Sequence, residues 1–114
     1  MLDHHSASQS DPLYDIHARD WAHDWAGEIG EHLEMPRLAW AAEVVGAVHE
    51  AAADATGLCV GTPVSIGSVD AWSEAFSAGV RRPGDLMLMY GSTMFFVQVL
   101  ETFRSHPLLW TTNG

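Results

Sequence analysis

Two places in this 114-residue sequence have residue types and positions that suit phosphoryl-transfer chemistry, and the first is Asp70. It follows an alternating apolar stretch that contains Val64 and Ile66, and the active groups of open α/β sheets gather at the carboxyl ends of strands. A carboxylate there can accept the proton of an attacking hydroxyl and orient that hydroxyl in line with a phosphorus atom. Asp70 could instead only cap a helix that begins at Ala71.

Gly91, Ser92 and Thr93 form the second candidate, because they interrupt an apolar run that extends from Met89 to Val97. A hairpin turn that contains Gly explains the interruption. A phosphate-binding loop explains it as well, because Gly allows close approach of a ligand, successive N–H groups can bind an anion, and two hydroxyls add donors. Both interpretations stay open at this stage.

Metal and nucleophile chemistry find less support in the sequence. His17, Asp20 and Asp24 fall near one face of an expected helix, but no H-E-x-x-H or paired-His spacing is present and Cys59 is the single cysteine. We therefore expect no metal site in these residues. A serine hydrolase is not indicated, since the G-x-S-x-G motif is missing.

The charge of the chain limits its partners. Five Arg, no Lys and fifteen acidic residues give a formal net charge of -10, so nucleic acid and anionic membranes are not expected to bind. No apolar run has the ~18 residues of a membrane-spanning helix. The N-terminus does not have the pattern of a secretory signal, and a lone cysteine fits a reducing compartment, so the expected location is the cytoplasm.

The elements that must position these residues follow from periodicity and turn signals. We expect a helix over residues 20–33 with Asp20 as its N-cap, a strand over 44–48, a helix that ends at a left-handed Gly57, and a strand that begins near Pro63. A helix over residues 71–80, a turn over 81–85, and apolar strands over 86–90 and 94–100 complete the chain. The pattern is mixed α/β, and strands that are apolar on both faces require cover on each side.

The segment "GTPVSIGSVDAWSEAFSAGVRRPGDLMLMYGSTMFFVQV" resembles the centre of an FGGY-family carbohydrate kinase, a group that includes xylulose, ribulose and glycerol kinases. The matching features are G-x-x-D at residues 67–70, a helix of small residues, a G-D turn at 84–85, and a strand broken by G-[ST]-[ST] at 91–93. Upstream, "DHHSAS" resembles a D-x-[ST]-N-A-S loop on the sugar side of the same family. The region that follows this loop in the family is similar to "YDIHARDW", "MPRL" and "AAEVVGAVHEAAADATGL". Nearly the whole chain is covered by this resemblance.

The resemblance implies an actin-like (ribonuclease H-like) ATPase fold with ATP, Mg²⁺ and a sugar or polyol in a cleft. Asp70 matches the catalytic base that deprotonates the sugar hydroxyl and so also contacts the substrate. Gly91, Ser92 and Thr93 match a loop that contacts the ATP phosphates. Asp3 and His4 fall where the substrate loop begins, although glycerol kinases have an aromatic residue at the position of His4.

The resemblance also implies a partial kinase. The D-x-G-T phosphate loop and the Gly-rich adenosine motif of the family are missing from the sequence. We therefore expect residues 1–82 to be the last part of the sugar-binding domain and residues 83–114 to open the nucleotide-binding domain. The chain alone is expected to be inactive. Two alternatives are a sugar-binding or assembly module that pairs with the missing kinase segments or with itself, and a remnant of a split gene.

Overall fold

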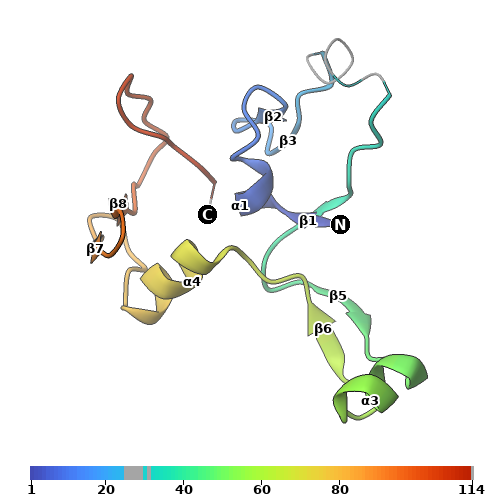
Figure 1. Cartoon of the computed structure of the whole chain (residues 1–114). Helices are drawn as coiled ribbons and strands as arrows, with labels where there is room; N and C mark the ends of the chain where they lie inside the picture. Colours follow the sequence, from blue (N-terminus) through green and yellow to red (C-terminus); the bar gives the residue numbers. More distant parts are fainter. Residues whose placement is uncertain (25–29, 31, 114) are drawn as a thin grey trace. The chain divides into compact units, whose positions relative to one another are not determined.

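The computed structural model describes residues 1–24, 30 and 32–113, and these form short helices and two-stranded sheets (Figure 1). The chain divides into two compact units: the first contains Met1–Gly67 together with Asn113, and the second contains Ser68–Thr112. The mixed α/β class predicted from the sequence is confirmed.

The first unit begins with four very short strands and one helical turn. Strand β1 (Leu2–Asp3) runs parallel to β4 (Leu38–Ala39), with Leu2 opposite Leu38. Strand β2 (Tyr14–Asp15) is antiparallel to β3 (Asp20–Trp21). Helix α1 (His4–Ala7) follows β1 directly.

These elements surround a small apolar core made by Ala7, Tyr14 and Trp21. The Tyr14 and Trp21 rings meet edge to face, with centroids 6.1 Å apart and planes at 87°, an arrangement that aromatic pairs favour. The Trp21 indole Nε1–H donates to the carbonyl oxygen of Pro36 at 2.8 Å, so its polar atom is satisfied. Partly buried side chains that pack around this core are Leu2, Leu13, Ile16, Met35 and Leu38.

The helix expected over residues 20–33 is wrong at both ends. Asp20 is not an N-cap, because it lies with Trp21 in β3 opposite Tyr14 and Asp15. Helical conformation is present at residues 23, 24 and 30, while Leu33 is outside the helix and half-exposed. The prediction rested on an apolar residue at every fourth position from Trp21 to Leu33, and the two between them, Trp25 and Ile29, lie outside the described residues. Trp21 packs against Tyr14 in a strand, and this burial outweighs the helical conformation that the spacing of the apolar residues predicts.

The rest of the first unit agrees with the sequence pattern. Strand β5 (Val44–Ala47) pairs antiparallel with β6 (Pro63–Ser65), and helix α3 (Glu50–Thr56) lies between them in the chain. His49 caps α3 by accepting the Ala52 N–H. The helix ends at Gly57 with φ 75°, the left-handed conformation that glycine adopts without steric cost.

The second unit starts with α4 (Asp70–Ser77), which is shorter than the expected helix over 71–80. It ends where Gly79 takes φ 95° and the Val80 N–H bonds back to the Ala75 carbonyl. The side chain buried on this helix is Ala75, whereas Phe76 is 59% exposed beneath the Arg81 guanidinium. The small residue faces inward here, and the large ring packs under a cation.

The turn and hairpin that follow are as predicted. The Asp85 carboxylate accepts the N–H groups of Arg81 and Arg82 at 2.9 and 2.8 Å, which closes the turn. These two hydrogen bonds lower the Asp85 pKa because they stabilise the charged form. Strand β7 (Leu86–Tyr90) then pairs in antiparallel register with β8 (Met94–Gln98), which ends two residues earlier than expected.

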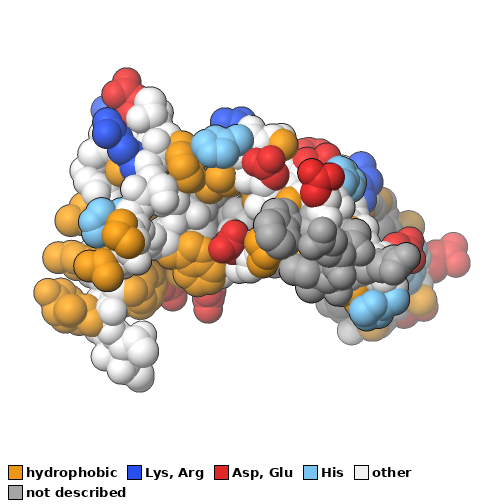
Figure 2. All heavy atoms as spheres, turned by 90° about the horizontal axis from the view of Figure 1, so that it is seen from above, with side chains coloured by type: hydrophobic (Ala, Val, Ile, Leu, Met, Phe, Trp, Pro, Cys, Tyr) orange, Lys and Arg blue, Asp and Glu red, His pale blue; other side chains and the backbone are white. Residues whose placement is uncertain are grey.

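The hairpin leaves apolar side chains at the surface. Figure 2 shows orange side chains gathered on the side where Figure 1 draws β7 and β8. One face of the hairpin is half-exposed or more, and its apolar members are Leu86, Leu88, Tyr90, Met94 and Phe96. A two-stranded hairpin is marginal in water unless another element covers it. The cover expected for these strands is therefore not supplied by the described residues.

His5 is a titratable residue buried in the first unit, at 8% exposure. Removal from water lowers the His5 pKa from 6.5 to about 4. The negative charge of Asp3 has the opposite, smaller effect and raises this pKa. The folded chain therefore keeps His5 neutral at pH values where the unfolded chain protonates it.

Stability should consequently fall as the pH is lowered from 6.5 toward 4, because the unfolded state takes up a proton that the folded state excludes. The loss is at most about 3 kcal/mol of unfolding free energy. Urea unfolding of the wild type and His5→Gln at both ends of this pH range measures it. We expect a shallower pH dependence in His5→Gln than in the wild type, and His32→Gln, at an exposed histidine, is the matched control. Equal slopes in all three proteins would contradict the assignment.

Candidate active site

Asp70 is the first residue of α4, with its side chain exposed. Val69, not Asp70, occupies the N-cap, so the capping role considered for Asp70 is wrong by one position. The carboxylate accepts the N–H of the next residue, Ala71, at 2.7 Å. A carboxylate in the first helical turn is favoured by the helix dipole, and its exposure leaves oxygen lone pairs open to a ligand.

Gly91, Ser92 and Thr93 form the exposed connection between β7 and β8. The Gly91 N–H donates to the Thr93 carbonyl at 3.0 Å, which closes the bend. In the part of the chain that the structure describes, the N–H groups of Ser92 and Thr93 and both hydroxyls make no hydrogen bond within the protein. The bend thus presents several donors to the outside.

Glycine at position 91 is not required by the backbone. Gly91 is absent from the residues with positive φ, and a Cβ built on it would meet only the Thr93 carbonyl oxygen, at 3.8 Å. A residue with a side chain and a backbone N–H could therefore take this position as far as the described chain is concerned. Since the backbone does not require glycine here, another reason for it is the close approach of an external group, which a side chain at this position would obstruct.

Asp3, expected at the start of the substrate loop, is buried at 5% exposure. Its carboxylate caps α1 by accepting the Ser6 N–H at 3.1 Å, and its other oxygen accepts the Ser6 hydroxyl. Both oxygens are thus engaged in holding the first turn of α1. Asp3 orders the loop, and its contact with a substrate stays a prediction.

His4, beside it, is only half-buried and is held by aromatic neighbours. Its Nδ1 lies 3.0 Å from the Tyr14 hydroxyl oxygen, and its ring lies over Trp40 with centroids 4.2 Å apart. The Arg19 guanidinium approaches the same Trp40 ring at 5.8 Å. The residue expected to touch substrate is therefore fixed in orientation.

Tyr14 and Asn113 belong to this site although the sequence analysis passed over them. The Asn113 side-chain amide donates to the Tyr14 hydroxyl oxygen at 3.0 Å and to the Ile16 carbonyl at 3.3 Å, and its backbone N–H donates to Ser8 Oγ at 3.1 Å. No local pattern predicts a contact between residues so far apart in the chain. The alternation of apolar and polar residues around Tyr14 was the available signal for its burial.

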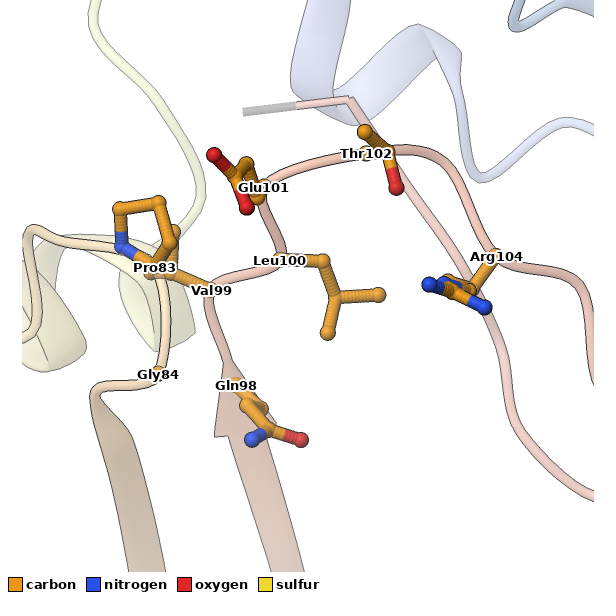
Figure 3. Close-up of a pocket in the computed structure, with 8 residues that line it drawn as sticks. All are labelled: Pro83, Gly84, Gln98, Val99, Leu100, Glu101, Thr102 and Arg104. Atoms are coloured by element: carbon orange, nitrogen blue, oxygen red, sulfur yellow. The ribbon is translucent and has the colours of Figure 1, made fainter.

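The kinase resemblance implies that Asp70 and the bend at 91–93 face the same cleft, and this convergence stays a prediction. Both lie in the second unit, and among the described residues no hydrogen bond or ring contact joins them. An open pocket of about 370 Å³ in that unit lies elsewhere, between the turn before β7 and the chain after β8. Figure 3 shows the Leu100 and Arg104 side chains pointing toward each other across it. The predicted site residues do not line this pocket.

Metal and membrane binding gain no support from the described residues. They contain no group of three or more His, Cys, Asp or Glu side chains placed to hold a metal ion. No described helix combines the length and the hydrophobicity that a membrane crossing requires.

Comparison with known proteins identifies the family. Residues 1–77 match the family model described as the FGGY family of carbohydrate kinases, N-terminal domain. The matched range contains Asp3, His4 and Asp70, whereas the bend at 91–93 lies beyond it. Comparison with curated proteins found no match. Because the family model covers well over half of the 114 residues, the chain belongs to the FGGY family of carbohydrate kinases.

Proposed function

We propose that Asp70 and the bend at 91–93 serve the ATP-dependent phosphorylation of a sugar or polyol hydroxyl. The proposed substrate class is a ketopentose or a related polyol. The observation that carries the proposal is the family match over residues 1–77, which includes an exposed carboxylate at Asp70. The cytoplasm, where ATP is available, is the corresponding location, and a single free Cys59 is compatible with it.

In the proposed reaction the sugar hydroxyl oxygen attacks the γ-phosphorus of ATP. A new O–P bond forms, the bond from the γ-phosphorus to the β–γ bridging oxygen breaks, and ADP leaves with the electron pair. Asp70 accepts the hydroxyl proton and, more importantly, orients the hydroxyl in line with the leaving group. The hydrogen bond from the Ala71 N–H limits rotation of the carboxylate while leaving its remaining lone pairs available.

The bend at 91–93 is the proposed contact for the ATP phosphates. Its support is the set of outward N–H and hydroxyl donors on Ser92 and Thr93, together with a glycine that the fold itself does not need. Backbone donors bind phosphate without a basic side chain. Carbohydrate kinases of this family typically use Mg²⁺ with ATP, but the described residues offer no cluster of ligand groups for a cation, so no step is assigned to one here.

The domain assignment belongs to the same proposal. Residues 1–82 would form the last part of the sugar-binding domain and residues 83–114 the opening hairpin of the nucleotide-binding domain of an actin-like fold. The turn closed by Asp85 lies at this proposed boundary. The family match ends at residue 77, shortly before it, which is compatible with the assignment.

The role of Asp70 can be tested by substitution. The 114 residues alone should release no ADP with D-xylulose, D-ribulose or glycerol, because their sequence has no D-x-G-T phosphate loop. In a kinase completed with segments that supply this loop and the adenosine site, Asp70→Asn should lower kcat by about 100-fold or more, since the proton acceptor is lost. Glu74→Gln, an exposed carboxylate one turn along α4, is the matched control. Full activity of Asp70→Asn would exclude the base role.

The phosphate contact can be tested at Gly91. Gly91→Val should fold normally, because a Cβ at this position meets only the Thr93 carbonyl oxygen at 3.8 Å, but it should weaken ATP binding by obstructing close approach. Titration calorimetry with ATP in the completed kinase measures the change. Gly46→Val, whose Cβ also enters open space, is the control for a general effect of the substitution. Unchanged ATP affinity in Gly91→Val would leave the bend as an ordinary hairpin turn.

A second candidate function, assembly with other kinase segments, is favoured by the exposed face of the β7–β8 hairpin. Exposed strand edges and apolar faces form protein contacts. Leu88→Lys with Phe96→Lys, a directly opposed pair on this face, should abolish copurification with coexpressed kinase segments. Val44→Lys, an exposed apolar position in β5, should leave copurification intact. If the hairpin variant still copurifies, this face is not the assembly surface.

A further inference from the structure

The hydrogen bonds around His4 determine which of its ring nitrogens carries the proton. The donor and acceptor roles in this chain of hydrogen bonds can be assigned from the Ile16 backbone carbonyl, because a carbonyl oxygen can only accept. The Asn113 side-chain atom 3.3 Å from that oxygen must therefore be the NH₂ group, and this fixes the orientation of the amide. The Asn113 backbone, held by its N–H bond to Ser8 Oγ, supports the same placement.

The oriented amide sets the direction of the next hydrogen bond. The second Asn113 N–H points to the Tyr14 hydroxyl oxygen at 3.0 Å, so that oxygen is an acceptor toward Asn113. A phenol has a single proton, and the remaining partner of this hydroxyl is His4 Nδ1 at 3.0 Å. The Tyr14 proton therefore lies on the line to His4. Burial raises the Tyr14 pKa, which keeps the phenol protonated and able to donate.

His4 Nδ1 must then be the acceptor, and a neutral imidazole with an acceptor at Nδ1 carries its proton on Nε2. Trp40 restricts the ring further, because the two ring centroids lie 4.2 Å apart with their planes at 31°. Among the described residues, Nε2 has no hydrogen-bond partner within the protein. The relay thus ends in a donor that is free to meet a ligand.

The structure assigns to Tyr14 and Asn113 the role of positioning residues: through a one-way hydrogen-bond relay they hold neutral His4 as the Nε2–H tautomer, which presents a donor to an acceptor oxygen of the substrate. The assignment of the tautomer stands on the relay alone, whereas the identity of the ligand rests on the proposed function. The matching substrate atom is a hydroxyl or carbonyl oxygen of a sugar or polyol. His4 would therefore contact its ligand through a directional hydrogen bond.

The tautomer can be read directly from the nitrogen resonances of the ¹⁵N-labelled 114-residue chain. We expect wild-type His4 to be the Nε2–H form. His49 and His106 supply internal references in the same spectrum, because their Nδ1 atoms accept backbone N–H groups from Ala52 and Leu108 and so favour the same tautomer. A wild-type His4 protonated on Nδ1 would overturn the assignment.

Asn113→Asp is the decisive variant, since a carboxylate of the same shape can only accept. Tyr14 should then donate to the new carboxylate, its oxygen should accept from His4, and His4 should change to the Nδ1–H tautomer while His49 and His106 stay unchanged. Asn113→Ala, which removes the donor without reversing the relay, and Tyr14→Phe should each yield a mixture of tautomers at His4. A His4 signal that remains Nε2–H in all three folded variants would refute the relay.

The ligand role has a separate readout. Addition of glycerol, D-xylulose or D-ribulose should shift the His4 Nε2 resonance of the wild type more than the Nε2 resonances of His49 and His106. A correct tautomer with no response to these compounds would contradict the substrate-loop part of the proposed function and leave the relay intact. A response to these compounds by a His4 that is protonated on Nδ1 would refute the relay and leave the substrate-loop part of the proposed function intact.

Discussion

Tyr14 has to satisfy two requirements at once, and the first unit is arranged around them. Its ring packs edge to face on Trp21 and contributes to the apolar core, while its hydroxyl lies in the same buried environment and needs partners. A buried hydroxyl without a hydrogen bond costs about 1–3 kcal/mol. His4 and Asn113 remove that cost, so the apolar contact fixes β2 against β3 and the polar contact ties α1 and the end of the chain to them.

The second unit has no comparable centre. Among residues 68–112, Ala75 is the buried side chain, and the β7–β8 hairpin keeps its register through backbone pairing with one apolar face half-exposed. The turn closed by Asp85 and the left-handed Gly79 and Gly84 are local devices that shape the chain without a core. Such a segment can present an ordered bend, but apolar cover must add to its stability. This difference explains why the exposed bend is formed as predicted while its relation to Asp70 is not fixed by side-chain contacts.

The sequence predicted best those elements whose causes are local. Helix α3 follows from an alanine-rich stretch with Gly57 at its end, and the hairpin follows from two apolar runs around Gly91. The expected helix at Asp20 failed because Trp21 gains more from distant partners, Tyr14 and the Pro36 carbonyl, than from its helical neighbours. The burial of Asp3 and the role of Asn113 were beyond prediction for the same reason: both depend on residues brought together by folding.

The charge of the chain constrains the contact with ATP that the proposed function requires. A protein with a formal net charge of -10 and no lysine repels a polyanion at long range, so an attractive contact must be short-range and directional. Backbone N–H groups and hydroxyls meet that requirement, and the bend at 91–93 supplies them without a neighbouring carboxylate between Leu86 and Gln98. The same reasoning applies to the contact proposed at His4, where a neutral N–H donor would meet an uncharged hydroxyl. Both proposed contacts therefore use dipoles, and the one charge assigned to the chemistry is the Asp70 carboxylate, which must be negative to accept a proton.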